Sequence, residues 1–166
     1  MQGEPHLAFG VKLMQKSIAA LLLGAFAVFG LPATQVLATV ILPNLPAGTM
    51  YQLLFVTHDP TTALSSDIST YNSFASTEAS LSPALDALHA TWHAVGSTAT
   101  INVIVNAPNN GVAVYDTQGN LLASAGDGIY AGFLQAPPQY DQYGNLNNSD
   151  VDIWTGSFAS GVAASP

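Results

Sequence analysis

The stretch DQYGNLNNSDVD, residues 141–152, is the part of the chain richest in oxygen-bearing side chains. Calcium binds about six to eight oxygen ligands from carboxylates, amides and carbonyls. The spacing differs from an EF-hand loop, which needs Gly at its sixth position and Glu at its twelfth. Two interpretations stay open, a calcium site and the more common solvated loop. The candidate calcium ligands are Asp141, Asn145, Asn147, Asp150 and Asp152.

Two acids in this stretch could also serve hydrolysis. Asp150 and Asp152 point the same way if they lie on a regular strand, and like charges at that spacing repel and attract a cation. A glycosidase needs two carboxyl groups across a cleft, about 5 Å or 6.5–9.5 Å apart. Neighbours on one strand supply no such cleft. A hydrolase that uses Asp127, Asp150 and Asp152 is therefore kept as the alternative to a non-catalytic protein.

The histidines give weaker chemical signals. His89 and His93 stand four residues apart, as two metal ligands on one helix would, but a zinc protease needs Glu where this chain has Ala90. His58 precedes Asp59, and an Asp-oriented His is one part of a nucleophilic triad. No G-x-S-x-G motif accompanies it. We expect surface, capping or strand-end roles for these side chains.

Charge excludes several classes of function. The net charge is −8, and Lys12 and Lys16 are the only basic residues besides histidine. Nucleic-acid binding requires Lys or Arg to neutralise phosphates, and anionic membrane surfaces attract the same residues. The chain contains no cysteine, which excludes thiol catalysis and Fe–S clusters. The sequence predicts an acidic protein without nucleic-acid partners.

The N-terminus predicts export. The apolar run at residues 17–30 is shorter than the roughly 20 residues of a membrane-spanning helix, and the basic residues before it are typical of a signal peptide. The VLA motif places signal cleavage after Ala38, with Ala33 as the second choice and an uncleaved anchor as the alternative. Cleavage leaves residues 39–166 as one secreted domain, extracellular or periplasmic and not held in the membrane.

The first half of this domain predicts a strand and two helices. Residues 50–58 form a continuous apolar run, typical of a buried strand. A helix should begin after Ser66 or Asp67, which are good N-cap residues. A second should begin at Ser82 with Pro83 in its first turn and extend to about residue 92.

The second half predicts short strands and loops. Residues 98–106 alternate apolar and polar side chains, which favours a strand. Residues 111–124 indicate a hairpin with its turn at Asp116–Asn120, and residues 152–157 one more strand. The sequence after Gly126 is rich in Gly, Pro, Asn and Asp. No internal repeat is recognised in the chain.

Five pieces of the chain, in order, resemble secreted bacterial proteins of the PEP-CTERM type. That group is similar in layout to endostatin and C-type lectins. The resemblance implies an α+β fold with two early helices packed on small antiparallel sheets and a loop-rich C-terminal half. The pieces are LFVT (54–57), YNSF (71–74), TWHAVGSTAT (91–100), VYDTQGNLLAS (114–124) and IWTGS (153–157).

The chain departs from that group in three ways. The usual LWDG appears as IYAG, which places Ala131 where the group has Asp. The sugar-site triplets of C-type lectins, EPN, QPD and WND, are missing. The final strand and the sorting tail are also missing, so we expect a domain truncated at its C-terminus or one that has lost its anchor.

Trp154 has two possible roles. As a ligand residue it would stack on a sugar ring. As a core anchor, the favoured interpretation, it would face inward from its strand. The sequence therefore predicts a non-catalytic secreted or cell-surface domain that binds glycan or extracellular matrix material. The alternatives are the carboxylate-dependent hydrolase and a truncated product without a stable role.

Overall fold

The computed structural model describes residues 39–147, 153 and 155–164. The chain divides into two units, Met1–Val36 and Leu37–Pro166, and every described residue belongs to the second. The predicted signal peptide at residues 1–38 thus lies outside the described residues. Within the described part, no helix has the length and apolar character needed to cross a membrane.

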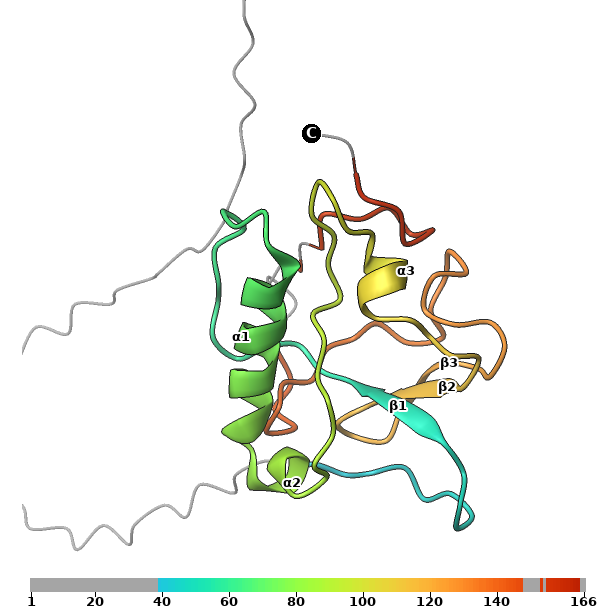
Figure 1. Ribbon diagram of the computed structural model, residues 1–166. Helices are drawn as coiled ribbons and strands as arrows, with labels where there is room; N and C mark the ends of the chain where they lie inside the picture. The colour runs from blue at the N-terminus through green and yellow to red at the C-terminus, as the bar shows by residue number, and fades with distance from the viewer. Residues whose placement is uncertain (1–38, 148–152, 154, 165–166) are drawn as a thin grey trace, which may run out of the picture. The chain divides into compact units, whose positions relative to one another are not determined.

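A three-stranded sheet lies at the centre of the fold, with the order β1-β2-β3 (Figure 1). Its strands are β1 (Tyr51–Leu54), β2 (Ala113–Asp116) and β3 (Leu121–Ala123). The hairpin β2–β3 is antiparallel and confirms the predicted turn. The pair β1–β2 is parallel, so the expectation of purely antiparallel sheets is wrong. The physical reason is the long connection through three helices, which returns the chain in its original direction.

Helix α1 (Ile68–Ser80) begins where the sequence predicted. The Asp67 carboxylate accepts hydrogen bonds from the Ser69 backbone N–H at 2.9 Å and from the Ser69 hydroxyl at 2.7 Å. These hydrogen bonds lower the pKa of Asp67, because they stabilise its charged form. The helix buries one narrow face, Ala75, Glu78 and Ala79. Glu78 is an unusual member of that face, because buried carboxylates need polar partners.

Helix α2 (Pro83–Asp86) starts as predicted, with Ser82 at its N-cap and proline in its first turn. It is one turn long, so the expectation of a helix to about residue 92 is wrong. His89 adopts a left-handed backbone conformation with φ 50°. A right-handed α-helix cannot continue through a residue in this conformation. Trp92 packs in a T-shaped contact on Phe55 instead, with ring centroids 5.2 Å apart.

Residues 98–106 do not form the predicted strand. They contain a short helix, α3 (Val103–Asn106). The Ser97 hydroxyl accepts the Val103 N–H at 2.8 Å, and the Asn106 amide donates to the Ala94 carbonyl oxygen at 2.8 Å. Such side chain–backbone bonds offer the chain an alternative to pairing in a sheet. Val103 consequently faces inward, and Ile104 and Val105 are left exposed.

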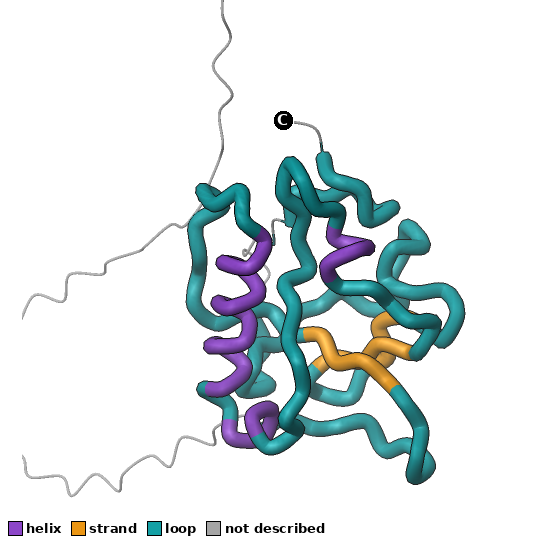
Figure 2. Tube along the Cα trace, in the orientation of Figure 1, coloured by secondary structure: helices purple, strands orange, loops and turns teal. Residues whose placement is uncertain are grey.

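The apolar core is small, and loops make up most of the second half of the described chain (Figure 2). This confirms the α+β class and the loop-rich C-terminal half. Buried Val114, Leu122 and Ala123 form the centre of the core. Partly buried side chains pack around this centre, namely Leu54, Ile129, Leu134 and Ala136. With so little apolar packing, polar contacts must hold many of the loops.

Candidate functional site

Two turns of the described chain share one sequence and one geometry. The stretches YDTQGN (115–120) and YDQYGN (140–145) both read Y-D-x-x-G-N. In each, the Asp N–H donates to the Asn carbonyl oxygen, at 3.0 and 2.9 Å, and the Gly N–H donates to the Asp carbonyl oxygen, at 3.2 and 3.0 Å. The glycines have φ 74° and 83°, as in a type I turn followed by a left-handed residue. The chain therefore uses one six-residue turn motif twice, which is a much shorter unit than a repeat of whole structural elements.

The aspartate of each turn holds its own loop together. Asp116 accepts the N–H groups of Gln118 and Asn120, both at 2.9 Å. Asp141 accepts those of Tyr143 at 2.9 Å and Asn145 at 2.8 Å. In both turns the Asn side chain donates to the second carboxylate oxygen. The two aspartates are 1% and 0% exposed, so fixed N–H donors take the place of water around each charge.

The two turns lie against each other. The Thr117 hydroxyl of the first turn donates to the Asp141 carbonyl oxygen at 2.8 Å. The Gln118 amide nitrogen donates to the Gly144 carbonyl oxygen at 3.1 Å and to that of Thr39 at 2.8 Å. Residue 118 thereby links both turns to the first described residue of the chain.

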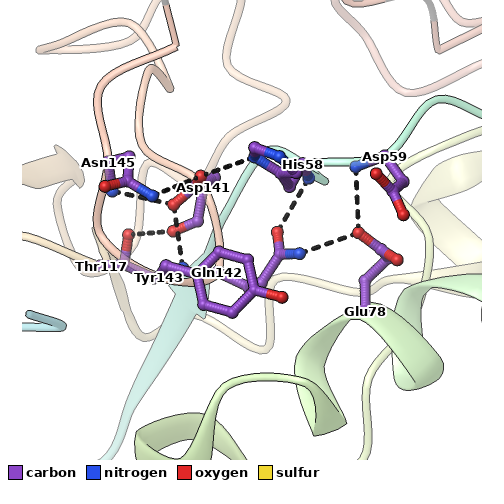
Figure 3. Close-up of polar contacts among 8 residues, drawn as sticks. All are labelled: His58, Asp59, Glu78, Thr117, Asp141, Gln142, Tyr143 and Asn145. Carbon is purple, nitrogen blue, oxygen red and sulfur yellow. Dashed lines mark hydrogen bonds and ion pairs between the residues drawn. The ribbon is translucent and has the colours of Figure 1, made fainter. Parts of the chain in front are cut away.

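His58 contacts the second of these turns from the segment that follows β1 (Figure 3). Its Nδ1 lies 3.1 Å from Asp141 Oδ2, and its ring makes a T-shaped contact with Tyr143 at 5.9 Å between centroids. The His58 side chain is 57% exposed. A carboxylate on Nδ1 fixes the ring and leaves Nε2 for other partners. The aspartate that contacts His58 is Asp141, 83 residues away, which no sequence spacing indicates.

A second polar chain joins the same segment to helix α1. Gln142 is fully buried; its Oε1 accepts the His58 N–H at 2.8 Å, and its Nε2 donates to Glu78 Oε2 at 2.8 Å. The same Glu78 oxygen accepts the Asp59 N–H at 3.1 Å. This network explains the buried carboxylate on α1, which holds the loop after β1 in place (Figure 3).

The predicted calcium ligands are brought together only in part. Asp141 and Asn145 contact each other through the second turn, and the Asn147 N–H donates to the Gln139 carbonyl oxygen at 2.7 Å. Asp150 and Asp152 lie outside the described residues. The described residues contain no cluster of three metal-ligating His, Asp or Glu side chains. Calcium binding stays a prediction, and at Asp141 the ion would have to displace existing hydrogen bonds.

Two further predicted sites have different outcomes. His89 and His93 do not share a helix, because α2 ends at Asp86, so their spacing does not create a metal pair. Trp154 lies outside the described residues, but its neighbour Thr155 accepts the Ser97 N–H on its carbonyl oxygen at 2.9 Å.

The described surface includes two open hollows. One, of about 340 Å³, lies between α1 and the segment after α2, and His89 and Trp92 are among its lining residues. The other, of about 450 Å³, lies between α3 and the loops at residues 108–111 and 126–131. Neither contains a pair of facing acids: the acid of the first is Asp86, and that of the second is Asp127.

Tyr130 at the edge of the second hollow gives a pH prediction. Its hydroxyl donates to the Ala107 carbonyl oxygen at 2.7 Å, and burial raises the pKa of Tyr130 to about 12. Between about pH 10 and 12 the unfolded chain loses this proton and the folded chain keeps it, so stability falls as the pH rises. Urea unfolding at about pH 9 and 11 should show a narrowing gap between the wild type and Tyr130→Phe. A gap that stays constant would contradict this.

Comparisons of the chain with protein-family models, curated proteins and solved structures find no match. The interpretation of the site therefore rests on its own geometry and chemistry. The repeated Y-D-x-x-G-N is the one signal that the sequence carried for the paired turns.

Proposed function

We propose that this protein is a non-catalytic secreted or cell-surface domain of a PEP-CTERM-like type that binds glycan or extracellular matrix material. The observation that supports it best is the use of the buried acids. Glu78, Asp116 and Asp141 all accept hydrogen bonds from within the chain. Their carboxylates hold loops in place, as a binding scaffold requires, and none of the three lines either hollow of the described surface.

The charge pattern supports a neutral ligand. No Lys or Arg follows Lys16, so the domain cannot neutralise a sulfated or phosphorylated polymer. Neutral sugars are instead recognised by hydroxyl hydrogen bonds and by contacts with aromatic rings. Loops rich in Asn, Gln, Ser and Thr provide donors and acceptors of the required kind.

The proposal predicts saccharide binding without turnover. The full chain, tested on a panel of neutral and sulfated glycans, should bind neutral members and leave them intact. Running the panel with millimolar calcium and with a chelator tests the predicted ion in the same experiment. Glycan binding that depends on calcium would support a calcium site within Asp141–Asp152. Glycan binding that persists in the presence of the chelator would contradict that site. A protein that binds only sulfated glycans would contradict the proposal.

One contact favours hydrolysis as a second candidate. The exposed His58 imidazole is oriented by the buried Asp141 carboxylate, which is the arrangement of a general base. Turnover of an ester or glycoside panel that is lost in His58→Ala would replace the binding proposal. His93→Ala, at another exposed histidine, is the matched control.

A further inference from the structure

An exposed turn precedes strand β2, with Asn110 and Gly111 at its centre. Both residues have positive φ, 55° and 70°, as in a type I′ turn. The Val112 N–H closes the turn by donating to the Asn109 carbonyl oxygen at 3.4 Å, and a typical bond of this kind measures about 2.9–3.0 Å. The closing bond is therefore weak, and the backbone at Asn110 can leave its turn conformation at little cost.

An asparagine that precedes a glycine can react with its own backbone, and Asn110–Gly111 is the only such pair in the sequence. The glycine nitrogen attacks Cγ of the asparagine, and the new N–Cγ bond closes a succinimide ring. The bond from Cγ to the side-chain nitrogen breaks, and that nitrogen leaves as ammonia with the proton that the backbone nitrogen loses. Water then opens the ring at either carbonyl, which gives aspartate or isoaspartate. Glycine favours the attack because it has no Cβ to hinder its nitrogen.

The reacting groups of this pair are accessible in the folded chain. Asn110 and Gly111 are both exposed, and an added Cβ at Gly111 would find no atom within 4 Å. Within the described residues, neither the Asn110 side chain nor the Gly111 N–H has a hydrogen-bond partner. The Gly111 nitrogen can therefore reach Cγ of Asn110 once the turn opens, without breaking any side-chain contact.

Other asparagine side chains of the described chain are held in place. Each of four donates a hydrogen bond from its amide to an oxygen atom of another side chain, and none of the four precedes a glycine. They are Asn72, Asn106, Asn120 and Asn145. Their amides are bonded and the residue that follows each has a Cβ, so both factors disfavour the reaction there.

Asp127–Gly128 could form the same ring with loss of water, but the fold hinders it. The Gly128 N–H donates to the Ser124 carbonyl oxygen at 3.5 Å. Gly128 also packs on a side chain, because an added Cβ would lie 2.8 Å from Asn109 Cγ. The backbone at Gly128 thus has little room to turn onto the Asp127 carboxyl group. The folded structure therefore distinguishes an open pair at Asn110 from a crowded pair at Asp127.

We propose that Asn110 is a site of spontaneous deamidation, which adds a negative charge to the turn before β2 while Asp127–Gly128 stays unchanged. Asn110 and Asp127 line the same hollow, so the reaction places a second carboxylate beside the first. Isoaspartate also lengthens the backbone by one carbon, which should disturb the 3.1 Å bond from the Gly126 N–H to the Gly111 carbonyl oxygen. The reaction needs no ligand, so this inference is independent of the proposed glycan binding.

The test follows residues 110 and 127 separately during incubation of the full chain. Chymotrypsin cleaves after aromatic residues such as Tyr115, which lies between the two sites. In the folded protein, the peptide with residue 110 should gain the mass difference between an amide and a carboxylic acid. An enzyme that methylates isoaspartate should label that peptide and leave the peptide with Asp127 unlabelled. Conversion should be faster in mildly alkaline than in mildly acidic buffer, because the attacking nitrogen must lose its proton.

Two controls separate the effect of the fold from that of the sequence. In Asn110→Gln the amide is one carbon further from the backbone, so the mass gain and the label should be lost; thermal melts verify that the variant folds. In urea, where the crowding at Gly128 is removed, the peptide with Asp127 should also become labelled. The proposal is wrong if residue 110 keeps its amide in the folded chain, or if the Asn110→Gln peptide gains the same mass. Equal labelling of Asp127 in the folded and unfolded chains would overturn the protection assigned to Gly128.

Discussion

Replacing Asp141 by alanine is expected to lower the free energy of unfolding by about 3 kcal/mol. The carboxylate is fully buried and accepts hydrogen bonds from Tyr143, from Asn145 twice, and from His58. Alanine would leave three N–H donors of the turn without an acceptor, and each buried unpaired donor costs about 1–3 kcal/mol. The expected loss of about 3 kcal/mol lies near the lower end of the sum for three donors. The reason is that these donors are only partly buried and water can reach them.

Urea unfolding of the variant and two controls measures this effect. Asp127→Ala removes an exposed aspartate and should change stability by less than about 0.5 kcal/mol. Asp116→Ala removes the equivalent acid of the first turn and should approach the loss seen at Asp141. The difference between the two turn variants isolates His58, which contacts only the second turn. If Asp141→Ala unfolds at the same urea concentration as the wild type, the network does not stabilise the fold.

Gly144→Ala is expected to destabilise the fold by about 3 kcal/mol, clearly more than Gly119→Ala. Both glycines occupy the same left-handed position, and alanine there costs about 1–2 kcal/mol. At Gly119 an added Cβ would find its nearest neighbour, the Ile41 carbonyl oxygen, at 3.5 Å. At Gly144 it would lie 3.0 Å from the Thr39 carbonyl oxygen and would overlap the Gln118 amide. Overpacking of this kind adds about 1–3 kcal/mol.

Because the same turn occurs twice, Gly119→Ala serves as the internal control for Gly144→Ala. Thermal and urea unfolding of the two single variants should rank Gly119→Ala above Gly144→Ala in stability. Adding Gln118→Ala to Gly144→Ala removes the overlapping side chain, so part of the additional loss should return. Equal losses at the two glycines would mean that the turns do not pack against each other.

Local sequence chemistry was sufficient for several elements. The hairpin β2–β3 was predicted because the sequence DTQGN places glycine where a left-handed residue is required. The start of α1 was predicted from Asp67, and that of α2 from Pro83. In each case one residue fixes the backbone close to itself, through a positive φ at glycine, a side-chain cap or a proline ring, so the information is local.

Elements that depend on distant partners were predicted poorly. Residues 98–106 have the alternation of a strand, but Asn106 bonds to Asn72 and Ala94 and a short helix forms. The parallel pairing of β1 with β2 depends on how the intervening helices pack, which alternation of side chains does not encode. The motif Y-D-x-x-G-N was visible twice in the sequence. That the two turns pack against each other could be seen only in the folded structure.

The sequence by itself determined the charge of this protein more firmly than the place of any site. No Lys or Arg follows residue 16, so this part of the chain lacks the side chains that neutralise polyanions, wherever its loops lie. The tertiary structure decided which side chains meet: Asp141 with His58, Glu78 with Gln142, and Asn109 with Gly128. Charge is a sum over residues and can be read along the chain. Hydrogen bonds and close contacts act over about 3–4 Å, so only the folded chain brings these partners within reach.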